Sequence, residues 1–359
     1  MVLFNRYVDG HRRWTLASTL AVPLALSALL LTGCGGSTGD PRQTAIATSR
    51  PSAPAVQGAA NASGATATTN LQHVVWRRGA DLPVAVSETG VTALGKDIHV
   101  LGGYVSGRAH STTHLVFATT TGRWRTAAPL PRRLDHVGVA VVGNTLFAIG
   151  GYDASGHPAS TVYAYDSAAD TWSTRAPLPL ARSAAAVGVL KGQIHLVGGK
   201  GPRGDVTEHD VFDPAANRWT AAAPMPIARD HSASAVVGDR LLVAGGRPRN
   251  LNRVQSYDPT TNAWSELPPL PQGRSSFAGA SLGGNFLVLG GEDDSESAVL
   301  TSVGALNPTT QTWLPLTPLP QGLQGMQGAV VDGRLYLPGG GPSAGGVVQS
   351  ARLYILETA

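Results

Sequence analysis

The chain is poor in reactive and charged side chains. It contains one cysteine, Cys34, among 359 residues, so no disulfide can form within it. Charged residues make up 14% of the sequence, and no basic tract accompanies the formal net charge of +4, so we expect no nucleic-acid partner. A His-Glu-x-x-His motif and a glycine-rich phosphate loop are both absent. Apart from one apolar stretch near the start, no segment has the periodicity of a helix, which argues against a helical fold.

Glycine pairs and tryptophans, in contrast, recur at regular intervals. The pairs begin at Gly102, Gly150, Gly198, Gly245, Gly290 and Gly339, and the tryptophans are Trp76, Trp124, Trp172, Trp219, Trp264 and Trp313. Both series advance by 48, 48, 47, 45 and 49 residues, and a proline follows each tryptophan after seven residues. Markers that share one uneven spacing identify an internal repeat, and a period of this length is typical of a propeller or solenoid.

Each repeat has the pattern of four short strands. A run of small and branched residues, such as 137–142, precedes an apolar run that ends in Gly-Gly, such as 146–151. A third run ends in an aromatic residue, as in 254–259, and the fourth contains the tryptophan, as in 262–267. Glycine, asparagine, aspartate and proline separate the runs, which favours strands over helices. Four-stranded units arranged in a ring form a β-propeller.

The two ends of the repeat region are incomplete in complementary ways. The strand around Trp76 follows no glycine pair, whereas the unit that contains Gly339 and Gly340 has a third run over 348–356 but no tryptophan. We therefore predict an all-β, six-bladed propeller over residues 73–359, in which the N-terminal strand completes the last blade. Such closure leaves no long unpaired edge.

This pattern resembles the kelch repeat. The resemblance rests on the glycine pair, the tryptophan and an aromatic residue seven positions before it, present as Phe117, Tyr165, Phe212 and Tyr257 but replaced by Leu306 in the fifth unit. It implies a kelch-type propeller that binds a partner through the loops at one end of its channel. Kelch-type copper oxidases use a tyrosine crosslinked to cysteine, and no cysteine occurs in the repeats, so that chemistry is excluded.

The start of the chain has a different composition. Three arginines precede an apolar stretch over 14–31, and Leu31-Thr32-Gly33-Cys34 resembles a bacterial lipobox. We predict a lipoprotein signal over residues 1–33, lipidation of Cys34 and a membrane-anchored protein that faces the periplasm or the cell exterior. An ordinary signal peptide or a membrane anchor is the alternative. Residues 34–72 are rich in Ala, Ser, Thr and Gly, a composition that indicates a flexible tether.

The segments after the prolines and the loops after the glycine pairs should meet at one end of the blades, around the channel mouth. We expect ligand-binding residues there because loops on a rigid scaffold commonly carry function. The candidates from the post-proline segments are Glu88, Asp135, His136, Arg182, Arg229, Asp230, His231 and Arg274. Alternatively, the arginines belong to the repeat itself and bind loop carbonyls. No metal or cofactor is expected.

Two functions remain open from the sequence. The first is a monomeric, membrane-tethered binding module for a protein, peptide or glycan partner at the channel mouth, without catalysis. The second is a metal-free enzyme similar to the six-bladed kelch mutarotases that act on sialic acid. In that case Glu88, His136 and His231 would supply acid-base groups, and the arginines would hold a carboxylate.

Overall fold

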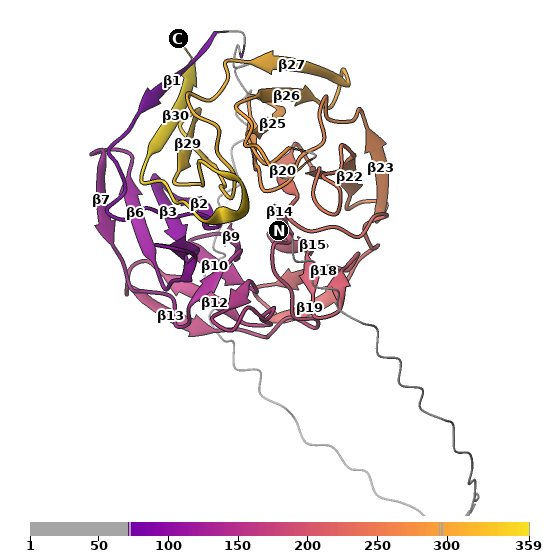
Figure 1. Ribbon diagram of the computed structural model, residues 1–359. Coiled ribbons are helices and arrows are strands. Elements are labelled where there is room, and N and C mark those ends of the chain that lie inside the picture. The colour runs from indigo at the N-terminus through magenta and orange to yellow at the C-terminus, as the bar shows by residue number, and fades with distance from the viewer. Residues whose placement is uncertain (1–70, 72, 294, 296, 359) are drawn as a thin grey trace, which may run out of the picture. The chain divides into compact units, whose positions relative to one another are not determined.

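The computed structural model describes residues 71, 73–293, 295 and 297–358. They form six four-stranded antiparallel sheets arranged as blades around a central axis (Figure 1). The predicted all-β, six-bladed propeller is therefore confirmed. Helical structure in this part of the chain is limited to one 3-10 turn, η1 (Ala344–Gly346), and no helix within it is long and apolar enough to cross a membrane. The predicted signal, Cys34 and most of the tether lie outside the described residues.

The first three blades follow one another along the chain, each with its first strand nearest the axis. The first blade contains β2 (Gly90–Leu94), β3 (Asp97–Leu101), β6 (His114–Ala118) and β7 (Arg123–Thr126). The second contains β9 (Gly138–Val142), β10 (Thr145–Ile149), β12 (Val162–Asp166) and β13 (Thr171–Thr174). The third contains β14 (Ala186–Leu190), β15 (Gln193–Val197), β18 (His209–Asp213) and β19 (Arg218–Ala221).

The remaining blades repeat this order and then close the ring. The fourth contains β20 (Ala233–Val237), β21 (Arg240–Ala244), β22 (Val254–Asp258) and β23 (Ala263–Leu267). The fifth contains β24 (Ala278–Leu282), β25 (Asn285–Leu289), β26 (Val303–Asn307) and β27 (Thr312–Leu316). The sixth contains β28 (Ala329–Val331), β29 (Arg334–Pro338), β30 (Leu353–Thr358) and the N-terminal strand β1 (Val74–Arg78).

The closing strand pairs in full register with the end of the chain. Val74 lies opposite Thr358 and Arg78 opposite Tyr354 in an antiparallel ladder, as the offset between the glycine and tryptophan series predicted. Leu71, which the sequence placed at the end of the tether, is buried in the hydrophobic cluster that β1 shares with the fifth and sixth blades.

Neighbouring blades are joined by one hydrophobic cluster at each of the six interfaces. The outer-strand tryptophans add a polar contact to each interface. Every indole N–H donates to a carbonyl of the preceding blade, as Trp172 does to Ala128 at 2.9 Å. The series includes the closure, where Trp76 donates to Thr317 and Trp124 to Ala80. Each tryptophan therefore combines a large apolar surface with a satisfied donor.

The glycine pairs allow the backbones of adjacent blades to touch. The second glycine of each pair donates its N–H to a carbonyl at the start of the next blade, as Gly151 does to Arg182 at 3.1 Å. The first glycine has no room for a side chain, because a Cβ on Gly150 would lie 2.3 Å from the Arg182 carbonyl oxygen. Gly150 also has a φ of 62°, in the left-handed region that glycine tolerates best.

A pair of alanine substitutions separates these two effects. Gly143 has a similar φ of 59°, but a Cβ on this residue would meet no atom within 4 Å. Gly143→Ala should therefore lower the free energy of unfolding by about 1 kcal/mol through backbone strain alone. Gly150→Ala should cost clearly more, because the Arg182 carbonyl must also move. Chemical denaturation of both variants measures the difference, and equal losses would contradict the contact between blades.

Two blades carry a pair of buried histidines between strands two and three. The ring nitrogens of His99 and His114 lie 2.9 Å apart in the first blade, and those of His195 and His209 lie 2.8 Å apart in the third. Burial lowers the pKa of His99 to about 3 and the pKa values of the other three to about 4. These histidines are therefore neutral in the folded protein, whereas the unfolded chain takes up protons near pH 6.5.

The histidine pairs should make the fold sensitive to mild acid. Their stabilising contribution is complete above the unfolded pKa of about 6.5 and is lost as the pH falls toward the folded values. The double variant His195→Leu/His209→Val copies Leu242 and Val254, which occupy the same positions in the fourth blade. The fall in melting temperature between about pH 7.5 and pH 5 should be smaller in this variant than in the wild type. Identical falls would show that the pair does not titrate on unfolding.

Candidate functional site

Six residues, one at the start of each blade, form a closed ring around the channel mouth. Each donates its backbone N–H to the carbonyl of the corresponding residue in the preceding blade, with N···O distances between 2.6 and 3.1 Å. All six have left-handed φ values between 49° and 59°. The members are Glu88, His136, Ala184, His231, Ser276 and Gly325. Such φ values are uncommon outside glycine, and residues held in them are often found at functional sites.

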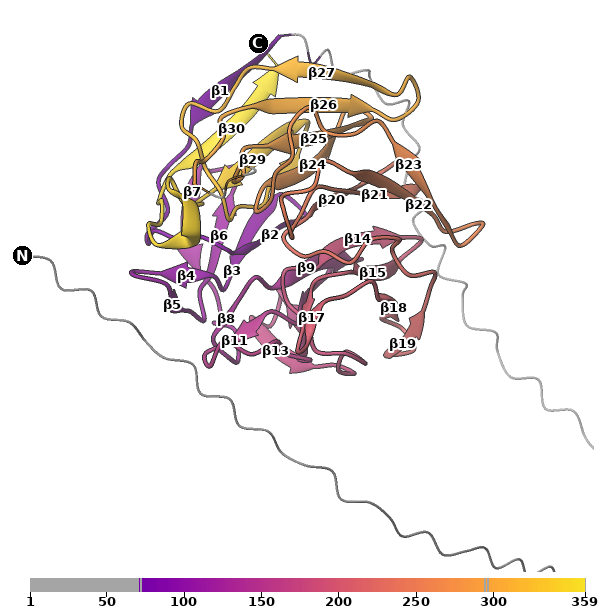
Figure 2. The same cartoon turned by 45° about the vertical axis from the view of Figure 1, so that its right-hand side comes forward.

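The ring is supported by the loops that follow the glycine pairs. The residue before each ring member forms a β-bridge with the residue after a glycine pair, as Ser183 does with Lys200 and Asp230 with Arg247. The short strands β4 (Tyr104–Val105), β5 (Ala109–His110), β8 (Leu134–Asp135), β11 (Tyr152–Asp153), β16 (Lys200–Gly201) and β17 (Gly204–Asp205) lie in the same segments. Several of them gather at one end of the blades in Figure 2, so the two predicted sets of loops do meet there.

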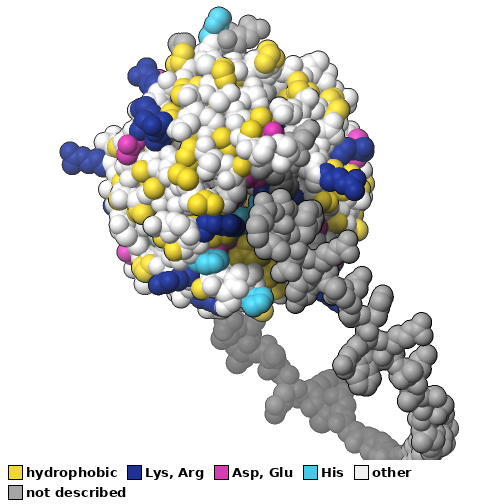
Figure 3. Space-filling view, in the orientation of Figure 1, with side chains coloured by type: hydrophobic (Ala, Val, Ile, Leu, Met, Phe, Trp, Pro, Cys, Tyr) yellow, Lys and Arg dark blue, Asp and Glu magenta, His cyan; other side chains and the backbone are white. Residues whose placement is uncertain are grey.

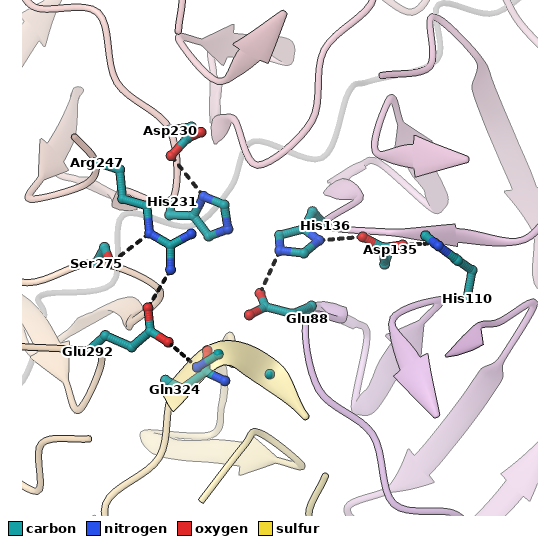
Figure 4. A network of polar contacts seen from close by, with 12 residues as sticks. Glu88, His110, Asp135, His136, Asp230, His231, Arg247, Ser275, Glu292 and Gln324 are labelled. Atoms are coloured by element: carbon teal, nitrogen blue, oxygen red, sulfur yellow. Dashed lines mark hydrogen bonds and ion pairs between the residues drawn. The ribbon is translucent and has the colours of Figure 1, made fainter. Parts of the chain in front are cut away.

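Three ring members place polar side chains close together. Glu88, His136 and His231 come from the first, second and fourth blades, and one polar atom from each lies within 4.8 Å of the other two. A Glu88 carboxylate oxygen (Oε2) lies 3.1 Å from His136 Nε2, and the two imidazole centroids are 4.8 Å apart. Figure 4 shows His136 and Glu88 facing the imidazole of His231. The three side chains are only 8–11% exposed.

An aspartate orients each histidine from behind. His136 Nδ1 contacts Asp135, and His231 Nδ1 lies 2.8 Å from an Asp230 carboxylate oxygen. Asp135 also contacts His110. Burial lowers the pKa of His136, but the charge of Glu88 and the hydrogen bond to Asp135 outweigh it, so that the pKa is raised overall. We refer to Glu88, Asp135, His136, Asp230 and His231 as the mouth cluster.

Aromatic rings enclose the second-blade histidine. Tyr104 and Tyr152 meet the ring of His136 edge-on, with centroid distances of 5.6 and 5.4 Å. Burial and the charge of Asp135 raise the pKa of Tyr104 to about 12, so its hydroxyl stays protonated near neutral pH. Burial also raises the pKa of Tyr152, and both tyrosine rings pack against His136.

A separate ion pair occupies the other side of the mouth. Arg247 contacts the carboxylate of Glu292 and donates from Nε to the Ser275 hydroxyl at 3.3 Å. The second oxygen of Glu292 accepts the N–H of Gly345, from η1, at 2.7 Å. These contacts, drawn in part in Figure 4, connect the fourth, fifth and sixth blades. Both carboxylate oxygens of Glu292 therefore have structural partners.

The channel behind the mouth cluster is an open cavity. Its volume is about 540 Å³, and Glu88, His136 and His231 lie in its lining. The remaining lining comes mostly from small side chains of the first strands, such as Ala140, Gly188 and Ala280. Polar groups from three blades thus converge at a concave space walled mainly by small side chains, a place where ligands commonly bind.

The three arginines predicted at the mouth are directed elsewhere. Arg182 is 1% exposed and donates to Asp210 and to the Leu196 carbonyl within the third blade. Arg229 donates to Gln255 and to the Val243 carbonyl, and Arg274 donates to the Ser302 hydroxyl. The equivalent positions of the second and sixth blades hold the buried Leu134 and Leu323. The position that the three arginines occupy in the repeat is thus a core position. We do not include these arginines in the proposed site.

One sequence motif typical of serine hydrolases occurs near the mouth cluster. Residues 341–345 have the Gly-x-Ser-x-Gly spacing of a nucleophile elbow. In such an elbow the serine sits between a strand and a helix. Here Ser343 precedes the three-residue turn η1, in which Gly345 has a φ of 79°, so the segment does not form an elbow.

One face of the propeller shows dispersed charged side chains. On the face seen in Figure 3, Lys and Arg side chains lie at several separate places, with no large basic patch among the coloured atoms. Among the residues that the structure describes, Glu88, His136 and His231 are the one group of three potential metal-ligating side chains whose ligand atoms lie within 4.8 Å of one another.

A stability comparison tests the structural assignment of the buried arginines. Arg182→Ala leaves the Asp210 carboxylate without its guanidinium partner in a site where its side chain is 10% exposed. We expect a loss of about 3–5 kcal/mol in the free energy of unfolding, as for other broken buried ion pairs. Arg132→Ala, which removes an exposed arginine 3.5 Å from Asp153, should have a small effect. Equal stability of the two variants in urea denaturation would contradict this assignment.

Comparison with known proteins gives the family. Residues 88–291 match the family described as the "KLHDC2/KLHL20/DRC7 Kelch-repeats domain". Among solved structures, the chain is similar to the "Structure of YjhT", with a TM-score of 0.67, 16% sequence identity, and coverage of 76% of this chain and 95% of that one. No curated protein matches the sequence. The matched region extends over more than half of the chain and includes five of the six glycine pairs. The chain belongs to the kelch-repeat family.

Proposed function

We propose that this kelch propeller is an exported, membrane-tethered binding module that holds the polar end of a glycan or peptide in its channel mouth. The observation that carries the proposal is the convergence of Glu88, His136 and His231 on one point above the cavity. Kelch propellers commonly act as interaction modules. These three side chains are not part of the recurring pattern, because the same position holds Ala184, Ser276 and Gly325 in the other blades.

The size and lining of the cavity favour a small group over a flat protein surface. A volume of about 540 Å³ lies within the usual range of small-ligand pockets, about 300–1,000 Å³. A sugar ring or a terminal peptide residue fits such a space. Its hydroxyl or carboxyl groups would meet the two imidazoles, while the small side chains of the first strands, such as Ala140 and Ala280, would contact its apolar parts.

The sequence before the propeller supports export and tethering. The lipobox-like residues 31–34 place the sole cysteine where lipidation requires it, and the tether over 34–72 would separate the propeller from the membrane. A lipid anchor with more than one acyl chain holds a protein stably at a membrane, whereas one chain is marginal. The ligand would then be a molecule of the cell envelope or the exterior.

A sugar mutarotase is the second candidate function. The two imidazoles, each backed by an aspartate, are the observation in its favour, because mutarotation needs a base for the anomeric hydroxyl and an acid for the ring oxygen. The arginines that would clamp a sugar carboxylate are engaged inside the blades instead. This candidate therefore has less support than binding alone.

A ligand screen tests the proposed function. Full-length protein is titrated with free sugars, sugar acids, oligosaccharides and short peptides, and binding is followed by calorimetry and NMR. His231→Ser places the ring residue of the fifth blade, Ser276, at the fourth-blade position and so preserves a side chain compatible with the left-handed backbone. We expect this variant to weaken binding at least about tenfold.

The control is His157→Ala, which changes an exposed histidine outside the mouth cluster and should leave affinity unchanged. Binding that His231→Ser does not alter would exclude the cluster as the ligand site. Accelerated exchange of sugar anomers by the wild type, lost in the variant, would replace the binding module with the mutarotase.

A further inference from the structure

The mouth cluster has the composition and spacing of a metal centre. The ligand atoms of Glu88, His136 and His231 lie within 4.8 Å of one another, and the pair from Glu88 and His136 is 3.1 Å apart. Zinc binds imidazole nitrogen and carboxylate oxygen at about 2.0–2.2 Å, so two ligands of one ion lie roughly 3–3.5 Å apart. A small movement of His231 would bring all three atoms within reach of one ion.

The two aspartates provide an independent observation. Histidines that ligate metals commonly donate their other ring N–H to a carboxylate, which fixes the tautomer and the orientation of the ring. Both histidines of the cluster have this arrangement, since Nδ1 of His136 contacts Asp135 and Nδ1 of His231 lies 2.8 Å from Asp230. In each of the two imidazoles, Nε2 is then the nitrogen available to a cation.

The backbone ring holds the three side chains in place for this purpose. Glu88, His136 and His231 share the left-handed conformation and the closed hydrogen-bond cycle, so their positions relative to one another are set by the scaffold. The other three members, Ala184, Ser276 and Gly325, carry small side chains or none and line the cavity, and the Glu88 carboxylate lies where a Cβ on Gly325 would stand. Side chains held by a rigid scaffold meet the geometric demands of a metal site better than side chains on free loops.

We propose that Glu88, His136 and His231 bind one divalent transition-metal ion, with Zn²⁺ as the best match, and that Asp135 and Asp230 form its outer shell. Two histidines and one glutamate are a ligand set of zinc sites that keep a fourth position open. That position would take water or an oxygen of a ligand in the cavity. The proposal revises the sequence-based expectation of a site without metal, and it does not require an organic ligand.

Metal titration tests the proposal with cobalt and zinc as the only probes. Full-length protein carrying a histidine-free tag is dialysed against chelator and titrated with CoCl₂, and visible absorption reports the coordination of the ion. We expect one Co²⁺ per chain with bands of a four- or five-coordinate site, displaced by an equivalent of ZnCl₂. His231→Ala should abolish stoichiometric binding, and His157→Ala should bind like the wild type. Ala184 shows that alanine is accepted at a ring position.

Two outcomes would overturn the proposal. One is a wild-type protein that gives no cobalt bands, and the other is equal affinity in His231→Ala and His157→Ala. Should His231→Ala unfold, Asp230→Asn decides instead, because it keeps all three ligands and should weaken binding about 10–100-fold. Unchanged affinity in Asp230→Asn would then count against the site. If the protein binds metal but no glycan or peptide in the ligand screen, the metal site is supported and the proposed glycan or peptide ligand is rejected.

Discussion

The contact on which the structure depends is the hydrogen bond from the glycine pair of one blade to the opening carbonyl of the next. It occurs at all six interfaces, including the one between the sixth and first blades, where Gly340 donates to Val86. The contact brings each opening segment close to the axis, and the adjacent ring residues then bond to one another in a closed cycle. Because the glycines have no side chains, the blades can approach closely. The hydrogen-bond cycle then fixes the positions of Glu88, His136 and His231 relative to one another.

The regular and irregular residues of the repeat have different roles. Tryptophans, glycine pairs and the small residues of the first strands recur in every blade and account for packing and closure. The ring position, in contrast, varies from glutamate and histidine to alanine, serine and glycine. The ring position thus combines a constant backbone with a variable side chain. A functional site can be built at such a position of a symmetrical fold, because the side chain can change without loss of the contacts between blades.

The sequence was sufficient for the fold because its information is local and repeated. The offset between the Gly102 and Trp76 series predicted both the blade count and the pairing of β1 with β30. All five residues of the mouth cluster were among the candidates named from the sequence. Their convergence on one point was not predicted, because Glu88, His136 and His231 are separated by 48 and 95 residues and form no local motif. Nor did the sequence separate Arg229 from a ligand-binding arginine, because a charged residue at a core position is recognised only once Gln255 and the Val243 carbonyl are seen around it. The one indication in the sequence was Leu134, an apolar residue at the equivalent position of the second blade, which is buried in the structure.

The central claim is that the cyclic scaffold directs one glutamate and two histidines to one cation site at the channel mouth. A crystal structure of the protein grown with zinc, with anomalous data collected on both sides of the zinc edge, tests it directly. The account predicts one strong anomalous peak bounded by His136 Nε2, His231 Nε2 and the Glu88 carboxylate, with the six-residue hydrogen-bond cycle intact. An intact cycle with no peak at this point, or zinc bound only at surface histidines such as His157, would contradict it.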